Sequence, residues 1–206
     1  MKSKIFIFLI FVATFSASCS TGKEVVLKNG DIIFQESQSS QCKAVQAATK
    51  SRYSHCGIIY IDNGKYYVYE AVQPVTVTPL KDWISRGKNN HYVVKRLKNA
   101  DIVLTAENIK KMKKVGEKFY GKDYDLTFEW SDDKIYCSEL VWKIYKRALD
   151  IEVGKLQKLG EFDLTADIVK QKIKERYGDD IPEDEVVISP VSIFESDLLE
   201  TVRNER

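Results

Sequence analysis

The chain has 206 residues, of which 44% are hydrophobic and 30% are charged, and its formal net charge is +2. This composition is typical of an ordinary folded protein of one domain and excludes a disordered chain. The near-neutral charge balance provides no electrostatic footprint for nucleic acid, so we expect no nucleic-acid partner.

The N-terminus has the pattern of an export signal. Lys2 and Lys4 supply positive charge, residues 5–15 form a short apolar run, and small residues precede Cys19. The apolar run is too short to span a bilayer as a stable helix. We therefore expect residues 1–18 to be a signal peptide and exclude them from the fold.

Cys19, which directly follows this segment, resembles the lipidation site of a bacterial lipoprotein signal. Cys19 would then be the first mature residue and carry a lipid anchor. The departure is Ser16, which occupies a position where that motif prefers Leu. Secretion without an anchor is the alternative. In both cases we expect a single domain over residues 25–206, located in the bacterial cell envelope, either in the periplasm or anchored to a membrane.

The first half of the remaining sequence predicts mainly strands and the second half mainly helices. Strands are predicted over residues 31–34 and 92–97 and on both sides of residues 62–65, and a short helix is predicted over residues 44–49. The later segments are a helix capped by Thr105 and ending before Gly121, a helix that follows Cys137, a helix over 165–177 and a short strand over 186–188. Strands followed by helices indicate an α+β fold with an antiparallel sheet.

The hairpin around Asn63-Gly64 fixes a register, because Asn-Gly between apolar runs is the strongest short-range hairpin signal. This register puts Gly57 opposite Glu70 and makes His55 a diagonal neighbour of Glu70. Side chains alternate along a strand, so His55, Gly57 and Glu70 share one face, and Gly57 leaves room for the carboxylate. Cys56 points to the other face, so we expect that it is not the thiol served by His55 and that it has no bearing on the triad.

Taken singly, a histidine on a strand and a lone glutamate are more often structural than catalytic. Together on one face they predict a working pair, since a carboxylate beside an imidazole raises its basicity and fixes its tautomer. His55 is then a candidate general base, and Glu70 is the residue that orients it.

Cys137 stands between a polar loop and a helix with a wide apolar stripe, which places it in or beside the first helical turn. Unpaired backbone N–H groups and the helix dipole favour a thiolate there, and the same groups can bind an oxyanion. The structural alternative is a small buried hydrophobic residue. Without Cys19 the exported chain has the odd set Cys42, Cys56 and Cys137, which also points to a free thiol.

The other cysteines have plainer interpretations. Cys42 lies in a polar stretch and is expected as a surface thiol, with a Cys42–Cys56 disulfide as the alternative. The sequence has no C-x-x-C pair and only two histidines, so it does not indicate a structural zinc site.

Several segments in this order resemble permuted papain-like amidases of the YiiX/YaeF type, which are relatives of NlpC-type cell-wall peptidases and of lecithin:retinol acyltransferase. The segments are Ser54–Ile58, Tyr69–Ala71 and Tyr136–Val141, together with Gly30–Phe34, Tyr124-Asp125 and, more weakly, Ser189-Pro190. The resemblance implies a circularly permuted papain-like fold, in which an antiparallel sheet carries the His and Glu and a packed helix bears the Cys at its N-terminus.

The resemblance also implies roles. Cys137 would be the nucleophile, His55 the base and Glu70 the third member of a triad, and Tyr124 a candidate oxyanion or substrate contact. It implies no metal and no organic cofactor. Residues 150–180 match no motif of the family and could shape a substrate cleft specific to this chain. The aromatic residues Tyr66, Tyr67, Tyr69 and Trp83 either line the substrate cleft or belong to the core.

These residues predict hydrolysis of an amide or ester through a thioester. The expected envelope location and the resemblance to amidases imply amides in peptidoglycan stem peptides or related amino-acid amides as the substrates. The alternatives are a lipid ester or amide hydrolase or acyltransferase, a non-catalytic envelope-binding lipoprotein, and a redox protein that uses Cys42 and Cys56.

Overall fold

The computed structural model describes residues 25–205. The predicted signal peptide and Cys19 therefore lie outside the described residues. Within the described part of the chain, no helix combines the length and the apolar character needed to cross a membrane.

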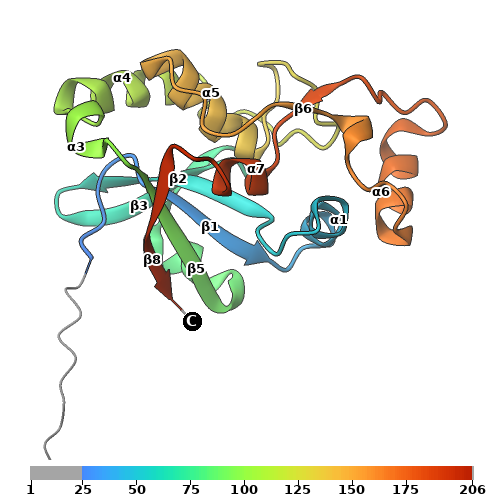
Figure 1. Ribbon diagram of the computed structural model, residues 1–206, viewed down its shortest axis with the longest axis horizontal. Coiled ribbons are helices and arrows are strands. Elements are labelled where there is room, and N and C mark those ends of the chain that lie inside the picture. Colours follow the sequence, from blue (N-terminus) through green and yellow to red (C-terminus); the bar gives the residue numbers. More distant parts are fainter. Residues whose placement is uncertain (1–24, 206) are drawn as a thin grey trace, which may run out of the picture.

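A six-stranded antiparallel sheet forms the centre of the molecule (Figure 1), in the order β4-β3-β2-β1-β5-β8. Its strands are β1 (Ile32–Ser37), β2 (His55–Asp62), β3 (Lys65–Glu70), β4 (Thr76–Pro79), β5 (Gly87–Leu97) and β8 (Leu199–Glu205). A separate two-stranded sheet pairs β6 (Gln157–Lys158) with β7 (Val186–Val187). The expected α+β class with an antiparallel sheet is confirmed.

The helices of the described residues are α1 (Ser40–Thr49), α2 (Leu80–Ser85), α3 (Ala100–Val103), α4 (Ala106–Gly116), α5 (Cys137–Leu149), α6 (Asp167–Tyr177) and α7 (Pro190–Phe194), with a short 3-10 turn over Leu159–Glu161. The four longest helices gather in two places around the sheet. In Figure 1, α4 and α5 lie together over one side of the sheet, whereas α1 and α6 lie together at one end of the molecule.

The two faces of the sheet bury different sets of apolar side chains. On the α5 side, Cys56 and Ile58 of β2 join a large core with residues of α4 and α5. On the opposite side, Ile59 and Val68 pack with Trp83 of α2. The alternation along β2 follows directly from the two-residue period of a strand.

The hairpin register is confirmed. β2 and β3 pair Asp62 with Lys65 and Ile58 with Tyr69, and both Asn63 and Gly64 have positive φ, as a tight hairpin turn requires. The sequence signal was sufficient here because the Asn-Gly turn and the apolar alternation agree.

Gly57 is required by the closeness of β3. A Cβ atom at this position would lie 2.5 Å from Val68 Cγ1 and 2.8 Å from the carbonyl oxygen of Tyr69. We predict that Gly57→Ala pushes β3 away, lowers the free energy of unfolding by about 1–3 kcal/mol and displaces Glu70. Urea denaturation measures the first effect. As a matched control, Gly121→Ala has open space around its Cβ and only its positive φ to strain it.

Helix α4 ends earlier than the apolar pattern predicts. Thr105 caps it as expected, with its Oγ1 accepting from the Asn108 N–H. The helix stops at Gly116, whose carbonyl accepts hydrogen bonds from the Tyr69 hydroxyl and from the Phe119 N–H. These bonds tighten the chain into turns, and Phe119 still reaches the core.

Helix α1 begins earlier than predicted and corrects the assignment of Cys42. The Ser39 hydroxyl accepts from the Cys42 N–H at 3.1 Å, which starts the helix in what looked like a polar stretch. Cys42 is therefore buried, not a surface thiol, and its sulfur lies 3.8 Å from the Ser54 carbonyl oxygen.

Candidate active site

The three predicted catalytic side chains come from the ends of three elements. His55 is the first residue of β2, Glu70 is the last residue of β3, and Cys137 is the first residue of α5. All three are buried. The structure brings them together around the imidazole of His55, whose hydrogen-bond partners are Cys137 and Glu70.

The imidazole is fixed on two of its sides. Its Nε2 lies 2.6 Å from Glu70 Oε2, and its ring stacks on Trp83 with 5.8 Å between the centroids. Because an ionised carboxylate only accepts hydrogen bonds, Nε2 is the donor to Glu70. The remaining ring nitrogen, Nδ1, is then the one available to Cys137.

Two residues that the sequence did not single out hold Glu70 in place. Thr78 donates its hydroxyl to Oε1 at 2.6 Å, and Arg86 donates from Nη2 to the same oxygen. Burial alone would raise the pKa of Glu70, but the hydrogen bonds and charge of His55, with those of Thr78 and Arg86, lower it to about 2. Glu70 is therefore ionised. The pairing of β3 with β4, which the sequence did not predict, brings Thr78 to it, and Arg86 reaches it from the end of α2.

The thiol of Cys137 is in an environment that favours its anion. A hydrogen bond from the Cys56 side chain is the largest effect that lowers its pKa. Burial opposes this, while the hydrogen bond and charge of His55 and a hydrogen bond from the Cys56 backbone lower it further. At the first residue of a helix, the dipole and the free N–H groups act in the same direction.

The expectation that Cys56 has no bearing on the triad is wrong, although the thiol beside His55 is Cys137, as predicted. Its side chain does point away from the face of His55, as the strand period requires, but that other face is the one on which α5 packs. Cys56 therefore contacts Cys137, and burial raises its own pKa, so it stays a neutral thiol donor. Cys42, Cys56 and Cys137 are all free cysteines, so the Cys42–Cys56 disulfide does not form in this structure.

His55 is correspondingly favoured in its charged form. Burial lowers its pKa, but the hydrogen bonds and negative charges of Cys137 and Glu70 outweigh that effect and raise it to about 10. The two shifts together describe a thiolate–imidazolium pair.

Tyr124 also lies beside Cys137. It forms a parallel bridge with Ile135, two residues before the cysteine, and its backbone N–H donates to Gln73 at 2.6 Å. Burial raises the pKa of its hydroxyl well above the usual range, so the phenol stays protonated and can donate toward the sulfur. Tyr124 thus lies beside the first residue of α5, where the backbone N–H groups of a helix have no partner within the helix.

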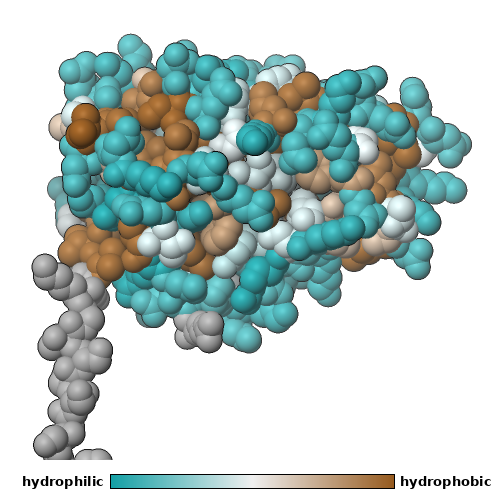
Figure 2. Space-filling model, in the orientation of Figure 1, coloured by the Kyte–Doolittle hydropathy of each residue, from teal (hydrophilic) through white to brown (hydrophobic). Residues whose placement is uncertain are grey.

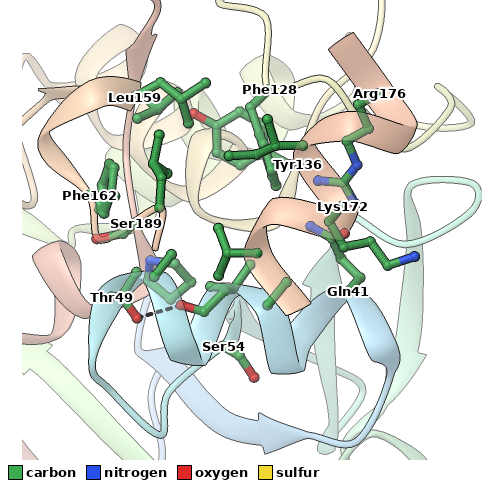
Figure 3. A pocket seen from close by; sticks show the side chains of 18 of the residues that line it. Gln41, Thr49, Ser54, Phe128, Tyr136, Leu159, Phe162, Lys172, Arg176 and Ser189 are labelled. Carbon is green, nitrogen blue, oxygen red and sulfur yellow. Dashed lines mark hydrogen bonds between the residues drawn. The ribbon is translucent and has the colours of Figure 1, made fainter. Parts of the chain in front are cut away.

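A cavity gives access to Cys137, which itself is only 3% exposed. The cavity lies between α1, α6, the residues before α5 and the turn near Leu159 (Figure 3). Residues 150–180 thus supply part of its wall, as expected from the sequence for a substrate cleft. Tyr66, Tyr67, Tyr69 and Trp83 do not line it.

The described residues contain no group of three or more His, Cys, Asp or Glu side chains that could hold a metal ion.

An antiparallel sheet carrying a His–Glu pair, with a cysteine at the start of a helix packed on it, defines a permuted papain-like hydrolase fold. The chain belongs to the permuted papain-like amidase family, YaeF/YiiX (C92), whose model matches residues 26–203.

Two relatives support this assignment. The chain is 50% identical to the uncharacterised protein YiiX of Escherichia coli K12 over 178 residues, which cover 86% of this chain and 87% of that protein. A crystal structure of YiiX from Escherichia coli O157:H7, described as a metalloprotein, superposes with a TM-score of 0.82 at 50% identity. The superposition covers 86% of this chain and 97% of the YiiX chain.

Proposed function

We propose that this chain is a cysteine amidase of the bacterial cell envelope, in which Cys137 is the nucleophile, His55 the base and Glu70 the residue that orients it. The observation that carries this proposal is the imidazole of His55, which is held between a carboxylate and a thiol of lowered pKa. The proposed substrates are amides in peptidoglycan stem peptides or related amino-acid amides.

The proposed reaction has two steps. The Cys137 thiolate attacks the amide carbonyl, a C–S bond forms, and the oxyanion is held by the first N–H groups of α5 and by Tyr124. The C–N bond then breaks as the His55 imidazolium gives its proton to the leaving amine. In the second step His55 takes a proton from water, the hydroxyl attacks the thioester, and the acid and the free thiolate are released.

Glu70 serves both steps without exchanging protons, because its carboxylate is ionised and keeps Nε2 of His55 as the donor. Nδ1 is therefore always the nitrogen that faces the sulfur and the leaving group. Arg86 and Thr78 are positioning residues that hold the carboxylate.

Alkylation by iodoacetamide tests the proposal, with the labelled site located by peptide mass spectrometry. We expect Cys137 to react faster than Cys42 and Cys56, and to react at lower pH than an ordinary thiol, because its pKa is lowered. His55→Ala should slow this labelling and shift it to higher pH, since the imidazolium no longer stabilises the thiolate. His91→Ala is the matched control, because it removes a histidine that stacks on Tyr53 and does not line the cavity.

The labelling series also separates the rival functions. A non-catalytic envelope-binding protein predicts an unreactive Cys137 with no dependence on His55. A redox protein predicts a reversible disulfide between Cys42 and Cys56 and indifference to the loss of His55. Either outcome would overturn the amidase proposal.

A further inference from the structure

The cavity above Cys137 has a strongly apolar half. Leu159, Phe162 and Leu164 form one wall, and Val169 and Ile173 of α6 face it. Figure 3 shows Leu159 and Phe162 on the side opposite the labelled side chains of α6. Along the part of the chain that the structure describes, no Asp or Glu lines this cavity. It therefore suits an aliphatic chain better than a peptide bearing several charges.

The other half of the cavity is polar and cationic. Gln41, Lys172 and Arg176 lie together on one side of it in Figure 3. The side-chain nitrogen and oxygen of Gln41 are both buried and have no hydrogen-bond partner in the described structure. A buried amide without partners costs free energy, so a ligand that supplied them would bind favourably.

Arg176 is the charged group best placed to receive an anion. Its guanidinium lies 5.3 Å from the centre of the Phe128 ring and is half-buried. Lys172 is paired with Glu175, whereas no carboxylate of residues 25–205 forms an ion pair with Arg176. A partly buried guanidinium of this kind favours a carboxylate, which it can bind through two hydrogen bonds.

The position of Tyr124 relates this charge to the reacting sulfur. Tyr124, Cys137 and Arg176 all line the cavity, and Tyr124 interacts electrostatically with both other side chains. An anion on Arg176 would therefore lie close to the scissile bond, and the apolar wall would lie beyond it. Figure 2 shows apolar surface among charged residues over the end of the molecule that carries α1 and α6.

We propose that the substrate is an amide between a long aliphatic acyl chain and an amino acid with a free carboxylate. The acyl chain occupies the wall of Leu159, Phe162 and Leu164, the carboxylate binds Arg176, and Gln41 hydrogen-bonds the polar head. This inference rests on the proposed function and narrows it to amino-acid amides with a fatty acyl group. Hydrolysis adds water across the amide C–N bond and releases a fatty acid and an amino acid.

The test compares kcat/KM for four probes: N-lauroylglycine, N-acetylglycine, N-lauroylglycinamide and a peptidoglycan muropeptide. We expect N-lauroylglycine to exceed N-acetylglycine by about 100-fold, because each buried methylene strengthens binding. It should exceed the uncharged N-lauroylglycinamide by about 10-fold, because Arg176 has no anion to bind there. Vesicles of phosphatidylglycerol complete the set and should release little fatty acid.

Arg176→Gln should lower kcat/KM for N-lauroylglycine by about 10-fold or more and bring its ratio to N-lauroylglycinamide near one. Arg176→Lys should restore part of that ratio. Lys174→Gln is the matched control, since it removes a cation from an exposed position on the same helix. A preference for the muropeptide, for the phospholipid or for N-acetylglycine would overturn the substrate inference while leaving the amidase proposal standing.

Binding separates the two proposals further. Isothermal titration of N-lauroylglycine into the Cys137→Ala variant should show binding that Arg176→Gln weakens by about 10-fold. Absence of binding overturns the substrate inference. Binding to this variant combined with no hydrolysis by the unaltered chain contradicts the proposed cysteine chemistry instead.

Discussion

Replacing Cys137 by Ala is expected to reduce amide hydrolysis by about 10³- to 10⁶-fold, because the covalent intermediate can no longer form. The sulfur is the only proposed group that bonds to the substrate carbonyl. Residual catalysis would come from binding and from the oxyanion donors at the start of α5 alone. Steady-state turnover of an N-acyl amino acid, followed by release of the free amine, measures the loss.

Cys42→Ala provides the matched control. Cys42 is also a buried free cysteine, but its sulfur contacts the Ser54 carbonyl and not the imidazole. Turnover within a few-fold of the unaltered chain is expected for this variant. If Cys137→Ala kept full activity, the nucleophile would have to be another group and the proposed reaction would be wrong.

The relation between His55 and Glu70 could be predicted from the sequence because one local signal fixes it. An Asn-Gly turn sets the hairpin register, and strand alternation then decides which side chains share a face. The same reasoning located Cys137 at a helix start. These inferences involve residues close in sequence or repeating with a known period, and the structure has them as predicted.

The residues around the triad could not be predicted in this way. Arg86 and Thr78 reach Glu70 only because β4 and α2 fold back on β3, and neither element has a strong periodic pattern. Cys56 was misjudged for a related reason. Its face was correct, but the sequence does not say which face of the sheet α5 covers, and that decides whether it meets Cys137.

The cavity depends on contacts between residues that are even further apart in the sequence. Gln41 on α1 and Arg176 on α6 are far apart in sequence and converge because the two helices pack through Ala44, Val169 and Ile173. In the sequence, Arg176 is one of many charges on a polar helix. In the folded chain, Arg176 differs from the exposed Lys170 and Lys174 of the same helix because it is partly buried and lines the cavity.

Replacing Glu70 by Gln is expected to lower turnover by about 10²- to 10⁴-fold, by analogy with the loss of the orienting carboxylate in other triads. A neutral amide cannot stabilise the His55 imidazolium, and it can present a donor to Nε2 and so select the wrong tautomer. The loss should appear in kcat as well as in kcat/KM. Glu107→Gln, on the exposed face of α4, is the control.

The same substitution should also change stability in a pH-dependent way. Glu70 is fully buried and its pKa falls from 4.5 to about 2 on folding, which corresponds to a contribution of about 3 kcal/mol. A carboxyl with a lowered folded pKa stabilises above its unfolded pKa, so this contribution is present above about pH 4.5 and is lost as the pH falls toward 2. Glu70→Gln removes the titrating group. The difference in unfolding free energy between the two proteins should therefore be largest near pH 6 and shrink as acid is added.

His55 sets the upper limit of the pH range in which the charged pair stabilises the fold. Its pKa rises from 6.5 to about 10 on folding, so its contribution is complete below about pH 6.5 and is lost as the pH rises through 10. Urea denaturation at pH 3, 6 and 10 should thus show both His55→Ala and Glu70→Gln most destabilised near pH 6. The stability of His55→Ala should approach that of the unaltered chain at pH 10, and the stability of Glu70→Gln should approach it at pH 3. Destabilisation of equal size at all three pH values would mean that packing, not the charged pair, holds these residues together. The ionised pair on which the cysteine chemistry depends would then be absent.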